Sequence, residues 1–420
     1  MLNALRASRL PSRVFPGGLT ALSILLFSCN LTLANTQGQG KGEKEGMEEF
    51  EEEDPYTKGK DELVKKLGYV RLGHGPWRPG EDTRTLQMNL GGIDMLFAET
   101  EHFCIASTLG TYKIPNNRDE RSKLKDEIKR LKKKLGRLKE PKKKLDPWLR
   151  LHIFAQRAED HYAEFCEDFS LTESDFKKSG PHMGYPNKIV LVVCQRKSEF
   201  GRYVRNYHNS DIEYAYRTVM RNDALFVAIN IEAIKEGREM ETELPFDTML
   251  HNMLASNLTT TFMDGYQDNM FSAPRWFVYG MSHRNLRRID PHWTLFDGRK
   301  ENQGSKWDAW KWSPRVYNLV DNGFYASAND MFTWKKYEDL HQRDHMVSWS
   351  KTEFLMDELE GDKRAFLSAI CNASGGFSTN QNDDELVNRQ KKALKDHFGL
   401  TPEEFDKAWC KWVKKTYRKR

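Results

Sequence analysis

Positions 251 and 255 of one predicted helix are the strongest candidates for metal-ligand positions. They are four residues apart, so they lie on the same helix face. Two histidines at this spacing can hold a zinc ion, and a glutamate directly after the first can accept a proton from zinc-bound water. In Phe246–Phe262 the first position is His251, but the proton-accepting position is Asn252 and the second ligand position is Ala255. The amide is not basic and the alanine offers no lone pair. The segment therefore lacks two of the groups that this chemistry needs.

A second pair of histidines also has metal-ligand spacing. His341 and His345 enclose Asp344, an order that resembles the inverted zinc motif H-x-x-E-H with aspartate in place of glutamate. The polar segment before the pair favours a solvated helix start instead. An unconventional metal site would use this pair, or would combine His251 with His283.

Other catalytic constellations each lack a necessary part. The segment Gly280-Met281-Ser282 has no second glycine, so it does not match the nucleophile elbow of a serine hydrolase. None of the cysteines has the local signature of a catalytic thiol. Tryptophans are concentrated in the same region, where core packing is favoured over a peptide- or glycan-binding groove. Seven fall within 74 residues: Trp276, Trp293, Trp307, Trp310, Trp312, Trp334 and Trp349.

The elements that would position these residues include both strands and helices. Three runs of apolar and β-branched residues predict strands: His102–Leu109, Lys188–Cys194 and Ala224–Asn230. A helix is predicted at Ser198–Tyr207, and Asp146-Pro147 starts another as an N-cap followed by proline. After Asp330 the chain is expected to be mainly helical, and a capping box at Thr401 starts the last helix. The pattern predicts an α+β fold.

This order of elements resembles the peptidase-MA-like gluzincin domains of exported bacterial proteins. The resemblance depends on Ser198-Glu199-Phe200 at a helix start, on the His251 helix, and on the following Pro274-Arg275-Trp276 segment. It runs from about His102 to Tyr417 and includes a closing segment with Phe398-Gly399 and Ala408-Trp409. It implies a small zincin-like sheet with two active-site-type helices.

The resemblance also implies where zinc would bind. Its ligands would be the residues at 251, 255 and 279, with the base at 252, but these positions hold His251, Ala255, Tyr279 and Asn252. A phenol with a pKa of about 10 is a poor ligand, and a catalytic zinc normally has three protein ligands. We therefore expect no metal, no other cofactor and no catalytic residue at these positions.

A strongly basic segment interrupts the α/β pattern. Arg118–Lys144 has fourteen Lys and Arg against five Asp and Glu, a net of +9, whereas the whole chain is only +5. Its apolar residues repeat at coiled-coil spacing: Leu124, Ile128, Leu131, Leu135 and Leu138. We expect a coiled-coil-like antiparallel hairpin over 118–170 that stands off the body. A solvated face is the favoured interpretation of its charge, with an anionic envelope surface as the alternative and no nucleic acid expected.

The N-terminus predicts export. Three arginines precede the short apolar run Leu19–Phe27, and Ala34 fits a signal-peptide cleavage position. An alternative is lipidation at Cys29, although Phe27 is bulky for that motif. Residues 35–60 form an acidic and glycine-rich linker, with eight acidic residues in Gly42–Asp54. No other run is long enough to span a membrane, so we expect a periplasmic or extracellular protein, with Cys29 as a candidate lipid anchor.

The remaining cysteines do not form a disulfide framework, because five are left and their spacing is scattered. A pair between Cys371 and Cys410 is the one disulfide that we suggest. The expected organisation is a signal peptide, a linker, the first part of the α/β domain, the hairpin, the gluzincin-like core and a helical C-terminal part. These are assigned to residues 1–34, 35–60, 61–117, 118–170, 171–290 and 291–420.

These observations favour a non-catalytic pseudopeptidase that binds a protein, a peptide or a cell-envelope polymer. One alternative is a metal-dependent peptidase or hydrolase whose zinc is held by unconventional ligands. The other is a structural protein that acts through the basic hairpin.

Overall fold

A computed structural model describes residues 53–136, 138–176, 180–220, 223–236, 245–266, 273–292, 310–371 and 383–417. All of them belong to one of the chain's two compact units, Glu48–Arg420. The predicted signal peptide, Cys29 and most of the predicted linker lie outside these residues. Within the described ranges, no helix is long and apolar enough to cross a membrane.

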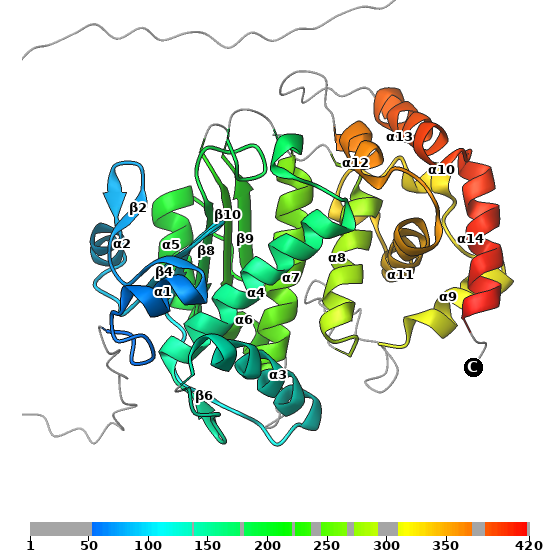
Figure 1. Cartoon of the computed structure of the whole chain (residues 1–420). Helices are drawn as coiled ribbons and strands as arrows, with labels where there is room; N and C mark the ends of the chain where they lie inside the picture. The colour runs from blue at the N-terminus through cyan, green and yellow to red at the C-terminus, as the bar shows by residue number, and fades with distance from the viewer. Residues whose placement is uncertain are drawn as a thin grey trace, which may run out of the picture. The chain divides into compact units, whose positions relative to one another are not determined.

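A mixed six-stranded sheet forms the centre of this unit (Figure 1). Its order is β1 (Tyr69–Leu72), β4 (Leu96–Thr100), β5 (Phe103–Ser107), β8 (Ile189–Cys194), β10 (Leu225–Asn230) and β9 (Ala215–Val219). The three central strands β5, β8 and β10 are parallel, whereas β4, β1 and β9 are antiparallel to their neighbours. The three strands predicted from sequence are therefore confirmed. They were recognisable because strands covered on both faces have continuous apolar sequences.

Helices cover both faces of the sheet (Figure 1). On one face, α2 (Thr83–Asn89) and α5 (Lys197–His208) enclose a core with Val190 and Val192 of β8. On the other face, α4 (Pro147–Asp168) and α7 (Phe246–Gly265) pack with Leu191 and Val193. Successive side chains of a strand point to opposite faces, so β8 supplies both cores. The predicted helix over Ser198–Tyr207 is confirmed as α5.

The predicted basic hairpin takes a different form. Helix α3 (Arg118–Lys134) buries its leucine seam in the main core together with α4. The short strand β7 (Lys144–Leu145) pairs with β6 (Tyr112–Lys113), which returns the chain to the start of α3 before α4 begins. Contacts accordingly advance in the same direction along both helices, Glu127 with Arg157 and Arg130 with Asp160. The prediction of an antiparallel hairpin standing off the body is wrong, because the seam packs on the body itself.

The chain after β10 is mainly helical, as expected. Its helices are α6 (Ile231–Glu236), α7, α8 (Arg275–Ile289), α9 (Trp312–Asp321), α10 (Ala328–Met331), α11 (Gln342–Glu353), α12 (Lys363–Cys371), α13 (Asp383–Phe398) and α14 (Pro402–Thr416). Both predicted helix starts are confirmed: Asp146 caps α4, and the Thr401 capping box starts α14.

The remaining short elements join these parts. The ribbon of β2 (Pro76–Arg78) and β3 (Glu81–Asp82) lies between β1 and α2, and α1 (Asp61–Leu67) precedes β1. Short 3-10 turns lie at Glu173–Asp175 and Tyr337–Asp339, and a π-helical turn at Phe354–Glu358 follows α11.

Two side-chain predictions can be compared with this fold. Trp276, Trp312 and Trp349 are buried, which agrees with packing, while Trp293 and Trp307 lie outside the described residues. The suggested disulfide between Cys371 and Cys410 is not formed. Cys371 on α12 lies near the Met263 carbonyl and Cys410 on α14 near Tyr325, so the two helices direct them into different surroundings.

Candidate functional site

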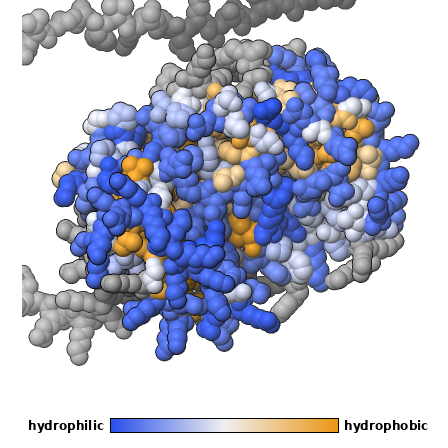
Figure 2. Space-filling model, viewed as in Figure 1, coloured by the Kyte–Doolittle hydropathy of each residue, from blue (hydrophilic) through white to orange (hydrophobic). Residues whose placement is uncertain are grey.

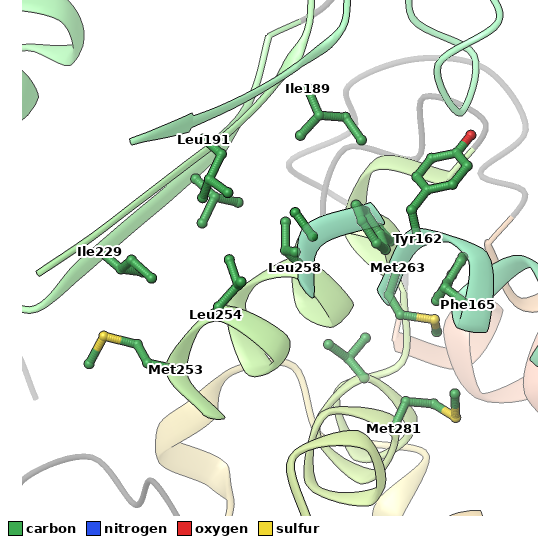
Figure 3. Packing of buried hydrophobic residues seen from close by; sticks show 14 of the residues in the cluster. Tyr162, Phe165, Ile189, Leu191, Ile229, Met253, Leu254, Leu258, Met263 and Met281 are labelled. Atoms are coloured by element: carbon green, nitrogen blue, oxygen red, sulfur yellow. The ribbon is translucent and has the colours of Figure 1, made fainter. Parts of the chain in front are cut away.

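Helix α7 carries three of the four predicted site positions and is enclosed on most sides. Figure 3 shows Leu254 and Leu258 pointing toward the strand residues Leu191 and Ile229, with Met281 of α8 on the opposite side of the helix. Most residues of α7, polar as well as apolar, are buried, so this helix lies in the interior of the protein. The site positions on α7 therefore face packed neighbours, and the contacts of each show what it does.

His251 faces helices α3 and α4. Its Nδ1 lies 3.8 Å from Oε1 of Glu127, and its side chain is only 14% exposed. Burial lowers the pKa of His251 well below its ordinary value, and the charges of Lys123 and Arg157 lower it further. The imidazole is therefore neutral at physiological pH and can act as one ligand or one hydrogen-bonding group, with no second imidazole at Ala255, which is itself buried.

Asn252 has a structural contact at the position where a peptidase would need its base. The side-chain Nδ2 donates to the carbonyl of Asp290 at 3.1 Å, which ties α7 to the end of α8. The residue is buried. A side-chain amide is not basic and cannot accept a proton from water.

Tyr279 lies on α8 among aromatic residues from the C-terminal part. Its ring centroid is 5.2 Å from that of Tyr337 and 5.8 Å from that of His345. Burial raises the pKa of Tyr279, so the phenol stays protonated and is a poor metal ligand. Within the described part of the chain, no hydrogen bond or ring contact joins Tyr279 to His251.

The other candidate histidines pair in an unexpected combination. Nε2 of His283 lies 3.0 Å from Nδ1 of His345, with the rings nearly perpendicular. Both rings are buried, and burial lowers both pKa values, that of His345 to about 4. His341 is exposed at the start of α11, where its backbone N–H donates to Asp344. Neither of the two suggested metal-ligand pairs, His251 with His283 or His341 with His345, is therefore brought together in the described structure.

The histidine pair depends on a close approach of α8 and α11 at Gly280, which no local sequence pattern predicts. A Cβ at Gly280 would lie 2.0 Å from Oγ1 of Thr352 and 2.7 Å from the Ser348 carbonyl, so α8 and α11 are in close contact there. The close approach brings His283 and His345 together across residues far apart in sequence. Two neutral imidazoles of this kind hydrogen-bond one another, and among the residues described no three His, Cys, Asp or Glu are arranged to hold a metal ion.

A buried charge network beside His251 was not recognised in the sequence. Arg157 of α4 donates to both carboxylate oxygens of Glu127 at 2.8 Å and to Asp247 at 2.5 Å. Glu120 of α3 accepts from the hydroxyls of Tyr112 and Thr248. The network thus connects α3, α4 and the first turn of α7. No local sequence signal indicates it, because its members come from strand β6 and from three separate helices.

The pKa values in the network follow from burial and from these pairs. Burial acts to raise the pKa values of Glu127 and Asp247, but the charge and hydrogen bonds of Arg157, together with the charge of Lys123, hold both below their usual range. Burial and the charge of Asp247 raise the pKa of Glu120. Burial and Arg157 lower the pKa of Lys123. Together these groups fill the surroundings of His251 with paired charges from α3 and α4.

Two surface cavities lie at other places. One of about 270 Å³ is lined by His102, Tyr162 and Cys166 among others, and one of about 390 Å³ by Tyr325, Trp334 and others. Nδ1 of His102 in the first cavity donates to Oε2 of Glu159 at 2.7 Å, while burial raises the pKa of the Cys166 thiol to about 11. A thiol that stays protonated is a weak nucleophile, so this cavity does not supply a cysteine-based active site.

Comparison with known proteins gives no match: no protein-family model, no curated protein and no solved structure is similar to this chain at a significant level.

Proposed function

We propose that this chain is a non-catalytic relative of the gluzincin-type peptidases, and that it binds an extended peptide segment along strand β9. Two features support the relationship: an antiparallel strand at one edge of a mixed sheet, and a buried helix α7 followed by α8 in the order that the resemblance implies. The absence of catalysis is supported by the contacts of Asn252, Ala255 and Tyr279, none of which offers a zinc ligand or a base. Export of the protein remains part of this proposal.

The observation that carries the proposal is the open edge of β9. Among the described strands β9 pairs only with β10. The Met220 N–H donates to the Ala224 carbonyl, which makes 220 and 224 a hydrogen-bonded pair. Because such pairs alternate along an antiparallel ladder, the backbone groups of Ala215, Arg217 and Val219 point away from β10. Outward-directed backbone groups on an edge strand can pair with an added strand.

Apolar side chains flank the same edge. Ile212, Tyr214 and Met220 are 42%, 51% and 37% exposed, and they are three of the six large exposed hydrophobic residues in the described chain. Backbone groups would supply affinity for an extended segment, and these side chains would contact alternate residues of it. The edge has both parts of a surface for strand addition.

The matched test uses an array of unstructured peptides of about 15 residues and purified protein. Ala215→Pro removes a donor that points outward, so it is expected to leave the ladder to β10 intact. The paired change Ile212→Asp with Met220→Asp removes apolar contact without touching the backbone. We expect each variant to bind the positive peptides at least about tenfold more weakly.

The control is Met88→Asp with Phe324→Asp, which removes two apolar side chains at other places that are even more exposed, at 68% and 70%. We expect it to bind the peptides as the unaltered chain does. Equal binding by all variants would rule out β9 as the binding edge. Equal losses in the test and control variants would show that the peptides bind apolar surface in general.

A further inference from the structure

The outer side of α3 and of the loop after it is a lysine platform. We define the platform as eight exposed lysines: Lys125, Lys129, Lys132, Lys133, Lys139, Lys142, Lys143 and Lys144. None of them forms an ion pair with another described residue. The first four recur at helical spacing, so they share one face of α3. Figure 2 shows hydrophilic residues gathered over this part of the molecule.

The buried seam of α3 is what makes the platform one-sided. Leu124, Ile128 and Leu131 pack in the main core, so the lysines between them can only point outward. In a free coiled coil the same lysines would flank a seam that another helix covers. Here the body of the protein covers the seam, and the lysine face has no protein neighbour among the described residues.

We propose that the lysine platform docks on an anionic lipid surface. Lysines act as separate point charges, which suits a diffuse layer of headgroups, whereas defined phosphate recognition favours the bidentate geometry of arginine. The large exposed hydrophobic residues of the described chain all lie outside 113–144. The platform therefore has no aromatic side chain to stack on nucleic acid bases and no apolar side chain to insert into a bilayer.

The chain enters the described residues beside the platform, since Tyr56 donates to Asp146 and Asp54 pairs with His152 at the start of α4. Asp146 comes directly after the lysine run Lys142–Lys144 and Leu145. The inference stands independently of peptide binding along β9.

Cosedimentation of the full chain with vesicles tests the proposal. We expect binding to phosphatidylcholine vesicles that contain about 30% phosphatidylglycerol, and loss of that binding when salt rises from about 50 mM to about 500 mM. Pure phosphatidylcholine vesicles measure any contribution of the apolar N-terminal run. The variant with Lys125, Lys129, Lys132 and Lys133 changed to glutamine is expected to bind anionic vesicles about 600-fold more weakly, at roughly fivefold for each lysine.

The matched control removes four exposed lysines from α14 by changing Lys407, Lys411, Lys414 and Lys415 to glutamine. It alters the net charge equally and is expected to bind nearly as the unaltered chain does. Equal losses in both variants would overturn the proposal, because total charge would then explain binding. Salt-independent binding, absence of binding at low salt, or tighter binding to duplex DNA than to anionic vesicles would also overturn it.

Discussion

Replacement of Arg157 by methionine is expected to lower the free energy of unfolding by about 3–5 kcal/mol. The guanidinium is fully buried and is held by Glu127 and Asp247 from two other helices. Methionine preserves much of the side-chain volume but removes the cation that pairs with both buried carboxylates, and leaves Glu127 with the longer contact to Lys123 at 3.5 Å. Urea denaturation at neutral pH, followed by circular dichroism, measures the change.

Arg130→Met is the matched control for this prediction. Arg130 of α3 pairs with Asp160 of α4, but the two side chains are 49% and 37% exposed. A solvent-exposed pair of this kind contributes at most about 1 kcal/mol. A second variant, Arg157→Met with Glu127→Gln and Asp247→Asn, is expected to recover part of the loss because it removes the unpaired charges. Equal small losses for Arg157→Met and Arg130→Met would show that the network does not stabilise the fold as described.

Gly280→Ala is the second substitution with a large expected effect, a loss of about 1–3 kcal/mol. The new Cβ would lie within 2.7 Å of the Ser348 carbonyl as well as within 2.0 Å of the Thr352 hydroxyl. A side chain can rotate, but a helix backbone can only retreat by moving the whole of α11. The His283–His345 contact would lengthen with it. Thermal and urea unfolding of the variant measure the loss.

The control for Gly280 is the helical glycine of α5. At Gly201 the nearest atoms to a new Cβ belong to the Arg205 guanidinium at 3.3 Å, the flexible end of a side chain. Gly201→Ala is therefore expected to be neutral or to stabilise the protein by about 0.5–1 kcal/mol, because alanine has the better helix propensity. If Gly280→Ala behaved in the same way, the close approach of α8 and α11 would be contradicted.

The parts of the fold that were predictable from sequence are those specified by local patterns. Strands β5, β8 and β10 are continuous apolar runs because both of their faces are covered. At two helix starts the side chains of Asp146 and Thr401 accept hydrogen bonds from backbone N–H groups three residues later. Neighbouring residues alone therefore define these helix starts. Edge strand β9 has no such pattern, since its sequence AYRTV mixes charged, polar and apolar residues on a half-buried surface.

The parts that were not predictable depend on contacts between distant segments. The leucine repeat of α3 specifies an apolar face but not what covers it, and the main core covers it rather than a second free helix. His283 and His345 come from helices that meet only because position 280 is a glycine. The candidate site was predictable in part. The side-chain chemistry of Asn252 and Ala255 already excludes them as base and metal ligand, but their packing depends on the fold.

Elemental analysis of the purified full chain is the most direct test of the central claim that the site has lost its zinc chemistry. With zinc supplied during expression, we predict a content far below one zinc ion per chain, and no change on His251→Ala, because one imidazole cannot hold a catalytic zinc. Circular dichroism would show whether the His251→Ala variant is folded. One zinc ion per chain that is lost in a folded His251→Ala variant would contradict the account.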